Sequence, residues 1–563
     1  MVDTELASPA RPWLSAYPSD VPAELDPRRF GTLAELFAEC TRRFPDRPAL
    51  RCFGGTVSYA ALKRDAEAVA GWLQGQGIGR GDRVAVMMPN VPAYAAVLFG
   101  TLIAGATVVN VNPLYTPREL THQLSDAGAR ILFALENFGA TVAQALPDLP
   151  SLETVVVTGA GDGLGLRGGL VTLAARHLKR AVPRFTLPAQ RRVAYGAVLA
   201  EGVKSGFRPV AVGPDDLAFL QYTGGTTGVA KGAMLTHRNI AANVEQCRLW
   251  FALPEGEDQG RVMVAALPFY HIFGLTCCFF YMMRVGACCL LIPNPRDIAG
   301  FVRTLRTNRF TFLSGVNTLF NALMAHRDFG RIDWSHLDYV IAGGMAVQAA
   351  VAQRWKEGTG RAIIEGYGLS ETSPVVSVNR RDLAQWSGTI GYPLSSTEVM
   401  VRRADGGAAA AGEPGELCVR GPQVMAGYWQ RPQETAAAMT PDGFFRTGDV
   451  AVLLPDGQIR IVDRMKDMIL VSGFNVYPNE VEDVLAAHPG VLEVAVVGEP
   501  NPETGELVVA HVVRRDPGLT AEALRAHARE GLTGYKVPRR VVFHDSLPKT
   551  NVGKVLRREL RGS

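Results

Sequence analysis

Apolar residues recur every three to four positions in several segments of the first 200 residues. The segments LAELFAE, after Thr32, and YAALKRDAEAVAGWLQ, after Ser58, show this spacing, and each follows a hydroxyl side chain that can cap a helix. Short apolar runs, such as DRVAVMM and ATVVNV, lie between such segments and are typical of buried strands. The repeated strand and helix patterns predict a largely parallel sheet covered by helices.

The pattern changes near residue 460. The segment IRIVDRMKDMILVSG indicates two strands joined by a charged turn, and short helix and strand patterns follow it to the C-terminus. We therefore expect an α/β protein with a large N-terminal domain at residues 1–463 and a small α+β domain at residues 464–563. The length of 563 residues agrees, because single hydrophobic cores stop growing at about 250–300 residues.

Charge and composition narrow the classes of function. The chain has 58 basic and 54 acidic residues, a net charge of +4, so we expect no nucleic-acid partner. The N-terminus lacks an apolar leader, and Pro92 and Gly100 interrupt the apolar run at 91–109, which favours a buried helix and strand. We expect a cytoplasmic protein without a membrane span. The eight cysteines lie mostly in apolar runs without a C-x-x-C pair, which favours buried thiols over a zinc site.

The segment YTGGTTGVAKGAML, from Tyr222, carries the strongest chemical signal. Its glycines allow backbone N–H groups to approach phosphate oxygens, two threonines add hydroxyl donors and Lys231 adds positive charge. It is not the common P-loop, which requires Gly-Lys-Ser/Thr. A second glycine pattern begins at Gly163 and fits G-x-G-x-x-G, but no acidic residue follows it before Ala200 to hold a ribose. A phosphate-binding loop is therefore favoured over a dinucleotide fold.

The phosphate-loop segment resembles that of the adenylate-forming superfamily of acyl-CoA synthetases, adenylation domains and luciferases. Further motifs of that superfamily occur in the same order: LPFYHIFG, AGGM, EGYGLSETSP, GELCVRGPQVMAGYW, FRTGD, DRMKDMILVSGFNVYPNEVE and PKTNVGKVLRREL. The resemblance runs from about residue 17 to the C-terminus and is strongest to the bacterial long-chain fatty-acid–CoA ligases. It implies that the small domain is mobile, and that ATP, Mg²⁺, coenzyme A and a fatty acid are the partners.

The resemblance also implies roles for individual residues. Those implied to be catalytic are Lys554, Thr227, Glu371 and His271, with Glu371 also the Mg²⁺ ligand and His271 beside the acyl carboxylate. Those implied to bind the nucleotide phosphates or adenine are Tyr222, Thr223, Gly224, Gly225, Thr226, Thr227, Gly228, Lys231, Gly343, Gly344, Glu365, Gly366, Tyr367 and Gly368. Asp449 and Arg464 are implied to hold the ribose, Lys466 or Asp467 to form the hinge, and Gly473 to line the thiol channel.

The implied reaction is ATP + fatty acid + CoA → acyl-CoA + AMP + diphosphate, through an acyl-adenylate. A fatty acyl-AMP ligase and an aryl or medium-chain acyl-CoA ligase on the same fold stay open as alternatives, and a non-catalytic nucleotide-binding scaffold is disfavoured by the intact motif residues. The apolar stretch 313–324 suits an alkyl chain, although a core helix gives the same letters. The oligomeric state is open, with a homodimer as one option.

One further segment suggests a contact with a membrane surface. Residues 163–200 hold seven Lys and Arg and no acidic residue. Helical spacing within LVTLAARHLKRAVPRF places Leu170, Leu173, Leu178, Ala181 and Phe185 on one face, which Arg176, Lys179, Arg180 and Arg184 flank. A basic amphipathic helix suits an anionic lipid surface, while a core-facing helix with a solvated basic edge explains the same pattern.

Overall fold

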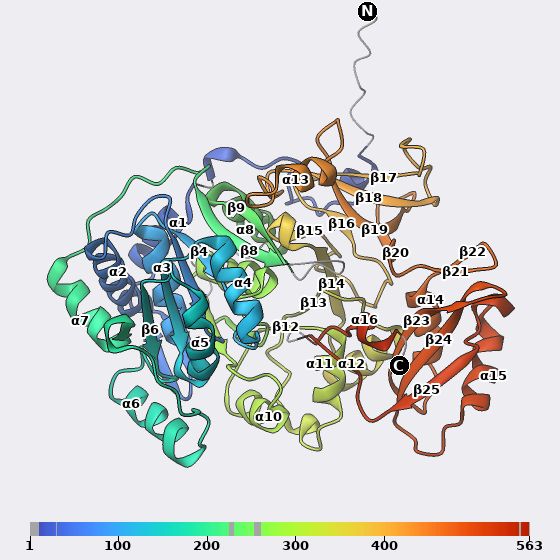
Figure 1. Ribbon diagram of the computed structural model, residues 1–563. Coiled ribbons are helices and arrows are strands. Elements are labelled where there is room, and N and C mark those ends of the chain that lie inside the picture. The colour runs from blue at the N-terminus through green and yellow to red at the C-terminus, as the bar shows by residue number, and fades with distance from the viewer. Residues whose placement is uncertain (1–10, 30, 224–229, 253–259, 551–552, 562–563) are drawn as a thin grey trace, which may run out of the picture.

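The computed structural model in Figure 1 has a large domain, coloured blue to orange, and a small domain, coloured red, at its C-terminal end. It describes residues 11–29, 31–223, 230–252, 260–550 and 553–561. The α/β class and the division into a large and a smaller domain are confirmed. The exact boundary after residue 463 stays a prediction; the strand that contains it runs to Arg464, and the sheet of the small domain begins at Ile469.

A mixed sheet occupies the N-terminal part of the large domain. Within the described residues its strand order is β7-β6-β5-β3-β4-β8-β9, and its members are parallel except for the last pair. The bounds are β3 Arg83–Met87, β4 Thr107–Asn110, β5 Ile131–Leu135, β6 Thr154–Thr158, β7 Arg192–Ala194, β8 Leu217–Thr223 and β9 Lys231–Thr236.

A second large sheet combines the first two strands of the chain with strands from Val262 onward. Its order is β16-β15-β14-β13-β12-β10-β11-β1-β2, with parallel pairs from β14 through β1 in the described part. The bounds are β1 Pro48–Cys52, β2 Gly55–Ser58, β10 Val262–Ala265, β11 Cys288–Leu291, β12 Phe312–Gly315, β13 Tyr339–Ala342, β14 Ile363–Gly368, β15 Val375–Val378 and β16 Tyr392–Pro393.

Two antiparallel units complete the described chain. The first closes the large domain and has the order β17-β18-β19-β20, with bounds Glu398–Arg402, Pro414–Arg420, Phe445–Leu453 and Ile459–Arg464. The second forms the small domain and has the order β22-β21-β24-β23, with β25 parallel to β24. Its bounds are β21 Ile469–Val471, β22 Phe474–Val476, β23 Val491–Asn501, β24 Gly505–Arg514 and β25 Arg540–His544.

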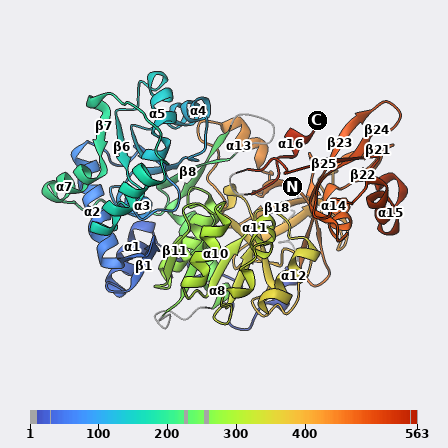
Figure 2. The ribbon, with the colours of Figure 1, turned by 90° about the horizontal axis from the view of Figure 1, so that it is seen from below.

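The helices cover the sheets in layers (Figures 1 and 2). In the large domain the bounds are α1 Leu33–Arg43, α2 Tyr59–Gly75, α3 Pro92–Ile103, α4 Pro117–Ala127, α5 Gly139–Ala145, α6 Gly165–Leu173, α7 Tyr195–Ser205, α8 His237–Phe251, α9 Tyr281–Arg284, α10 Ile298–Thr307, α11 Asn317–Met324, α12 Ala349–Thr359 and α13 Pro432–Ala438. In the small domain they are α14 Pro478–Ala486, α15 Ala521–Gly531 and α16 Arg557–Leu560.

Burial explains the layering. One core cluster joins side chains of both large sheets with those of α1, α2, α3 and α8, so these elements share one apolar layer. Separate clusters form between α4, α5 and the first sheet, and between α10, α11, α12 and the second sheet. The small domain has its own core, in which α14 and α15 pack on its sheet. Each sheet face therefore has a partner that removes its apolar side chains from water.

Local predictions from the sequence are confirmed at several points. Thr32 and Ser58 cap α1 and α2, with Thr32 in a capping box formed with Glu35. The run at 91–109 forms the buried helix α3 and the strand β4, and the cysteines are buried. Among the described helices, none is both long and apolar enough to cross a membrane.

The basic segment after α6 differs from its prediction. The helix continues only through a π-helical turn, η5 (Ala174–Leu178), and Arg180 adopts a positive φ of 48°. Phe185 turns inward and packs against Gly139 of α5, because a large aromatic ring gains more from the core than from a surface position. Arg176 is paired with Glu136 at 2.6 Å. The predicted face that was to include Phe185 is therefore shorter than expected.

Candidate active site at the domain junction

The carboxyl ends of β8, β13 and β14 border the predicted nucleotide site, which is where parallel sheets bind ligands. The predicted loop residues Gly224, Gly225, Thr226, Thr227 and Gly228 lie outside the described residues. The residues on either side of them are described: Thr223 ends β8, and Lys231 begins β9 as its direct cross-strand partner. Tyr222 is buried, and its hydroxyl donates a 2.7 Å hydrogen bond to Asp126.

Three predicted residues form one hydrogen-bonded group. The hydroxyl of Tyr367, on β14, donates to Oδ2 of Asp449, on β19, at 2.5 Å. The guanidinium of Arg464, on β20, lies 3.0 Å from Oδ1 of the same carboxylate, and the two residues are register partners in the antiparallel sheet. Burial, with the charge of Asp449 next, raises the pKa of Tyr367, so its hydroxyl stays protonated. The arrangement fixes a buried carboxylate where a ligand hydroxyl can reach it.

Lys554, from the small domain, is held against this group. The charges of Arg464 and Asp449 both act on its ammonium, which is half-buried. Burial is the larger effect, and together with Arg464 it lowers the pKa of Lys554 to about 8. The ammonium therefore keeps its charge at neutral pH but lies close to its titration range. The fold thus brings Lys554, which lies near the end of the chain, close to the predicted site.

A direct contact anchors the lysine turn on the large domain. The hydroxyl of Thr318, on α11, donates a 3.1 Å hydrogen bond to the carbonyl oxygen of Gly553. Gly553 has a φ of 84°, and a Cβ placed there would lie 2.6 Å from Oγ1 of Thr318. Both the backbone conformation and the close approach require glycine. The small domain therefore contacts α11 through the backbone of Gly553, the residue next to Lys554.

His271 lies in the same neighbourhood. Burial lowers its pKa to about 4, and the charge of Lys554 contributes to the shift. The imidazole is therefore neutral at pH 7 and can act as a hydrogen-bond partner but not as a cation. Its Nδ1 accepts a weak 3.4 Å hydrogen bond from the backbone N–H of Phe273. His271 therefore lies near Lys554, and its contact with the acyl carboxylate stays a prediction.

Glu371 follows β14 in a short 3₁₀ turn, η9 (Ser370–Thr372), and is buried. Its Oε1 accepts a 2.8 Å hydrogen bond from the hydroxyl of Tyr428, and burial raises its pKa. Among the described residues, no group of three His, Cys, Asp or Glu side chains is arranged to hold a metal ion. A single carboxylate is nevertheless a fitting Mg²⁺ ligand, because this ion commonly takes one or two carboxylates and completes its shell with substrate phosphates and water.

Lys231 has a protein partner in this structure. Its ammonium forms an ion pair with Glu434 on α13 and lies 5.2 Å from the ring centroid of Tyr428. Tyr428 therefore connects the two predicted phosphate-site groups, because its hydroxyl bonds Glu371 while its ring faces the lysine. A phosphate arriving at Lys231 must compete with the Glu434 carboxylate.

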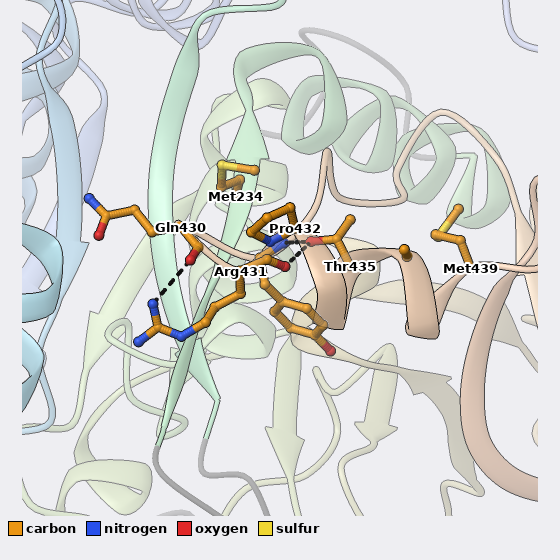
Figure 3. A pocket seen from close by; sticks show the side chains of 8 residues that line it. Met234, Gln430, Arg431, Pro432, Thr435 and Met439 are labelled. Carbon is orange, nitrogen blue, oxygen red and sulfur yellow. Dashed lines mark hydrogen bonds between the residues drawn. The ribbon is translucent and has the colours of Figure 1, made fainter.

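The start of α13 is fixed around a surface hollow of about 460 Å³, shown in Figure 3. Thr435 accepts a hydrogen bond from the backbone N–H of Tyr428 at 2.9 Å and donates one to the carbonyl of Arg431 at 2.9 Å. Arg431 in turn pairs with Asp126 at 2.7 Å. These bonds hold α13 in the position that places Glu434 at Lys231.

The predicted glycines of the adenine-binding motifs lie where there is no room for a side chain or where φ is positive. A Cβ at Gly343 would lie 3.0 Å from the ring of Phe273 and 3.1 Å from the carbonyl oxygen of Gly366, and Gly344 has a φ of 79°. A Cβ at Gly368 would lie 1.9 Å from the carbonyl oxygen of Pro374. The loop after β13 and the end of β14 therefore approach one another as closely as backbones allow.

Glu365 makes a contact that joins two parts of the backbone at the site. Its Oε1 accepts a 3.0 Å hydrogen bond from the backbone N–H of Val347, and burial raises its pKa to about 7. The side chain thus ties β14 to the loop that follows β13. In this structure Glu365 supports the loop of Gly343 and Gly344, and its implied role at the nucleotide stays a prediction.

The predicted hinge follows β20. Burial, and then the charge of Arg464, lowers the pKa of Lys466 to about 8. Asp467 lies 3.5 Å from Arg557. Gly473 lies in the exposed turn between β21 and β22, with a φ of 82°, and a Cβ placed there would meet only open space. The structure does not bring Gly473 to the Tyr367–Asp449–Arg464 group.

Sequence reasoning missed several of these partners. Arg557 is half-buried. It donates a 2.7 Å hydrogen bond to Glu482 on α14 and lies 3.7 Å from Asp463, so it links α16 to α14 and β20. Tyr428 and Glu434 lie in or just after the GYW motif, yet no local spacing pairs them with Glu371 or Lys231. Thr318 lies in an apolar helix where a lone threonine gives no signal.

The site lies where the ends of strands in the large domain meet a turn of the small domain. This arrangement is that of a two-domain enzyme in which the small domain completes the site. The model of the AMP-binding enzyme family matches residues 37–429, and that of the AMP-binding enzyme C-terminal domain matches residues 480–554. The chain therefore belongs to the AMP-binding enzyme family.

Individual relatives agree with this assignment. The long-chain-fatty-acid–CoA ligase of Escherichia coli O157:H7 is 50% identical over 551 residues, which cover 98% of this chain and 97% of that protein. The crystal structure of the anthranilate CoA ligase AuaEII with anthranoyl-AMP matches with a TM-score of 0.81 at 25% identity, covering 96% and 98% of the two chains. ATP-bound MatB from Rhodopseudomonas palustris matches with a TM-score of 0.76 at 30% identity, covering 94% and 98%.

Proposed function

We propose that this protein is a long-chain fatty-acid–CoA ligase that works through an acyl-adenylate. The observation that carries the proposal is the position of Lys554, held by the Thr318–Gly553 contact beside Asp449 and Arg464. A small-domain lysine at the nucleotide site suits the first half-reaction, in which charge develops on a phosphate. The near-full-length similarity to a long-chain-fatty-acid–CoA ligase supports the choice of substrates.

In the first half-reaction, a carboxylate oxygen of the fatty acid attacks the α-phosphorus of ATP. The bond from that phosphorus to the bridging oxygen breaks, and diphosphate leaves with the electron pair. Lys554 supplies a point charge to the pentavalent transition state, and Lys231 supplies one to the departing phosphates. Asp449 accepts hydrogen bonds from the ribose hydroxyls. Tyr367 stacks on the adenine, and its hydroxyl keeps the Asp449 carboxylate oriented.

Magnesium belongs to this proposal through Glu371. The free oxygen lone pairs of a buried carboxylate that Tyr428 already orients are suitable for one coordination bond. When bound, the ion would supply positive charge that neutralises phosphate oxygens. Tyr428 thus holds Glu371 in one rotamer before the nucleotide arrives.

In the second half-reaction, the CoA sulfur attacks the acyl carbon as its thiolate, the thiol proton is lost to solvent, and AMP leaves. Lys554 occupies part of the site during the first step, so the small domain must turn away to admit the thiol. Rotation at Lys466 or Asp467 would carry Gly473 toward the site in its place. Gly473 is now in an exposed turn, as expected of a residue that serves the other orientation.

The acyl substrate is the least constrained part of the proposal. Leu313, Phe320 and Leu323 pack in a core cluster with α10 and α12, which is the core-helix explanation of this apolar stretch. Chain length is therefore argued from similarity, and from the gain of about 0.8 kcal/mol for each buried methylene. A fatty acyl-AMP ligase, and an aryl or medium-chain acyl-CoA ligase, remain the alternatives to test.

We further propose a cytoplasmic location and the coupling of ligation to a membrane surface, where long-chain acids partition. The oligomeric state, including a homodimer, is an independent question that light scattering of the purified chain answers.

The test is diphosphate release across a panel of acids, with and without CoA. Palmitate and oleate should give a higher kcat/KM than acetate, octanoate or benzoate, and CoA should be converted to its thioester. Diphosphate and acyl-adenylate without thioester would identify an acyl-AMP ligase. A maximum at benzoate or at octanoate would identify one of the other ligases.

A further inference from the structure

Helix α6 projects from the lower left edge of the large domain in Figure 1. Three of its leucines, Leu166, Leu170 and Leu173, recur at positions that fall on one helical face. They are 96%, 68% and 54% exposed, and Leu178 in the following turn η5 is 83% exposed. An outward row of four leucines is an uncommon feature for a surface helix, because each could be replaced by a polar residue without loss to the core.

The opposite face of α6 is firmly attached. Gly168 is buried against Gly161, whose backbone lies so close that a Cβ on either would clash, and the backbone N–H of Gly161 donates to Thr172 at 3.1 Å. After the helix, Asn137 donates to the carbonyl of Ala181 at 2.9 Å. The helix is therefore held in a fixed orientation, and the leucine row is presented to the outside.

The charge around the leucines has one sign. Arg167, Lys179, Arg180 and Arg184 are exposed. The neighbouring acids are turned inward: Glu136 is buried and pairs with Arg176 at 2.6 Å, and Asp162 accepts the backbone N–H of Gly159 at 2.7 Å. Residues 163–200 contain no acidic residue. An apolar row with a basic border complements an anionic surface that is apolar beneath it.

We infer that the α6 face, defined as Leu166, Leu170, Leu173 and Leu178 with Lys179 and Arg180, docks on an anionic lipid surface. The leucines enter the boundary between headgroups and acyl chains, and the basic residues contact anionic headgroups. A lipid is favoured over a folded partner because the leucines lie on the outward side of a helix at the edge of the domain (Figure 1), and the exposed charges that border them are all basic. The inference does not depend on the proposed ligation chemistry, because α6 lies outside the Tyr367–Asp449–Arg464 group.

The experiment is co-sedimentation of the full chain with vesicles. One set contains phosphatidylcholine with phosphatidylglycerol, and the other contains phosphatidylcholine alone. The wild type should bind the anionic vesicles, and its affinity for the neutral vesicles should be lower by about tenfold or more. Each basic residue near an anionic surface raises the affinity by about tenfold or less. The double variants Leu166→Ser/Leu170→Ser and Lys179→Gln/Arg180→Gln should each lose binding by about tenfold or more.

A matched control replaces two other exposed apolar residues, Val203→Ser/Val210→Ser, and should bind as the wild type does. Thermal unfolding shows that each variant is folded, and the charge variant, which leaves the apolar residues in place, keeps the test valid if the leucine variant unfolds. Wild-type binding retained in both test variants, or equal binding to both vesicle types, would overturn the inference.

Two other outcomes are also decisive. If the wild type ignores vesicles and Leu166→Ser/Leu170→Ser converts a dimer to a monomer, the face is an interface between copies and the lipid inference is wrong. Ligation of octanoate, which needs no membrane, should be unchanged in all variants. A chain that binds vesicles through α6 but ligates no acid would contradict the proposed function while leaving this inference intact.

Discussion

The hydroxyl of Thr318 donates a 3.1 Å hydrogen bond to the carbonyl oxygen of Gly553, and this contact joins the large domain to the turn that carries Lys554. It links α11, in the middle of the chain, to a turn near its end. Because a carbonyl oxygen is the acceptor, the contact depends on the path of the backbone and not on a side chain of the small domain. It belongs to the orientation in which Lys554 faces Asp449 and Arg464.

Lys554→Ala should slow acyl-adenylate formation by about 10²- to 10³-fold, as loss of a preorganised charge does elsewhere. Thioester formation from supplied acyl-adenylate should stay within a few-fold of the wild type, because the lysine has left the site in that step. The two half-reactions are measured separately by diphosphate release and by thioester formation. Lys554→Arg should recover only part of the rate, since a planar guanidinium does not reproduce a compact ammonium. Equal losses in both half-reactions would show that the lysine is structural.

Gly553→Ala should selectively impair adenylation. The added Cβ would lie 2.6 Å from Oγ1 of Thr318, and the φ of 84° disfavours any residue but glycine. Both effects oppose the adenylating orientation, and a loss of about tenfold or more is expected in that half-reaction. Thr318→Val removes only the hydrogen bond and should cost about three- to tenfold.

The control for this contact is Thr318→Ser, which keeps the hydroxyl and should behave as the wild type does. A Thr318→Val variant that matches Thr318→Ser in both half-reactions would mean that the contact does not stabilise the adenylating orientation.

The rate of adenylation should fall at alkaline pH. Lys554 has its pKa lowered to about 8, so its charge is present below that value and is lost as the pH rises through it. Above it the rate should drop by about tenfold per pH unit until another process limits it. The measurement is diphosphate release from about pH 6.5 to about 9.5 under single-turnover conditions.

The diagnostic variant is Lys554→Arg, whose guanidinium stays charged over this range. Its slower rate should show no alkaline decline from this group, whereas Lys466→Arg should retain the decline. An unchanged pH profile in Lys554→Arg would assign the titration to another group.

Tyr367→Phe should weaken nucleotide binding without unfolding the protein. It removes the 2.5 Å hydrogen bond to Asp449 but leaves the aromatic face and the Arg464 ion pair. The KM for ATP should rise by about three- to thirtyfold with little change in kcat, because an interaction made in both ground and transition states is lost. A fall in kcat at constant KM would point instead to a role in the transition state.

His511 should make the small domain less stable as the pH falls from about 6.5 to 4, while Asp483 on α14, whose pKa burial raises to about 7, opposes this effect. His511 is buried on β24 between β23 and β25, its Nδ1 lies 2.9 Å from Nε2 of His544, and burial, with the neighbouring His544 and Arg540, lowers its pKa to about 4. Between these pH values the His511 side chain is protonated in the unfolded chain but not in the folded chain. Acid therefore favours unfolding through this residue. The contribution of His511 should amount to about 1–3 kcal/mol, measured as the difference between the wild type and His511→Asn in the change of unfolding free energy from about pH 7.5 to about pH 4.5 in urea.

Replacing His511 by Asn should remove part of this pH dependence, and replacing the exposed His336 by Asn should not. His237 and His271, whose pKa values burial also lowers to about 4, lie in the large domain and should affect its stability in the same direction. A His511→Asn variant with the full wild-type slope would show that His511 does not cause the acid sensitivity of the small domain.

Short-range features were predictable because their physics is local. Thr32 and Ser58 cap the helices that their neighbours' spacing indicated, and the change of pattern near residue 460 marks the strand that leads into the small domain. The candidate residues Tyr367, Asp449 and Arg464 were named from ordered motifs, and the structure brings them together.

Contacts that cross the chain were not predictable in this way. The pairing of Lys231 with Glu434, the orientation of Glu371 by Tyr428 and the use of Glu365 to hold the backbone of Val347 join residues whose sequence neighbourhoods contain no trace of one another. The partners of Arg557 likewise come from distant elements, α14 and β20.

The sequence by itself determined the α/β class, the change to a small C-terminal unit and the residue types at the site, because periodicity, caps and motif glycines act over a few positions. Only the tertiary structure decided that Lys554 docks through Gly553 on Thr318, and that four leucines of the α6 region face outward while Phe185 turns into the core. Whether an apolar side chain is buried or exposed depends on which distant element covers it, and a local pattern fixes a face without fixing its partner.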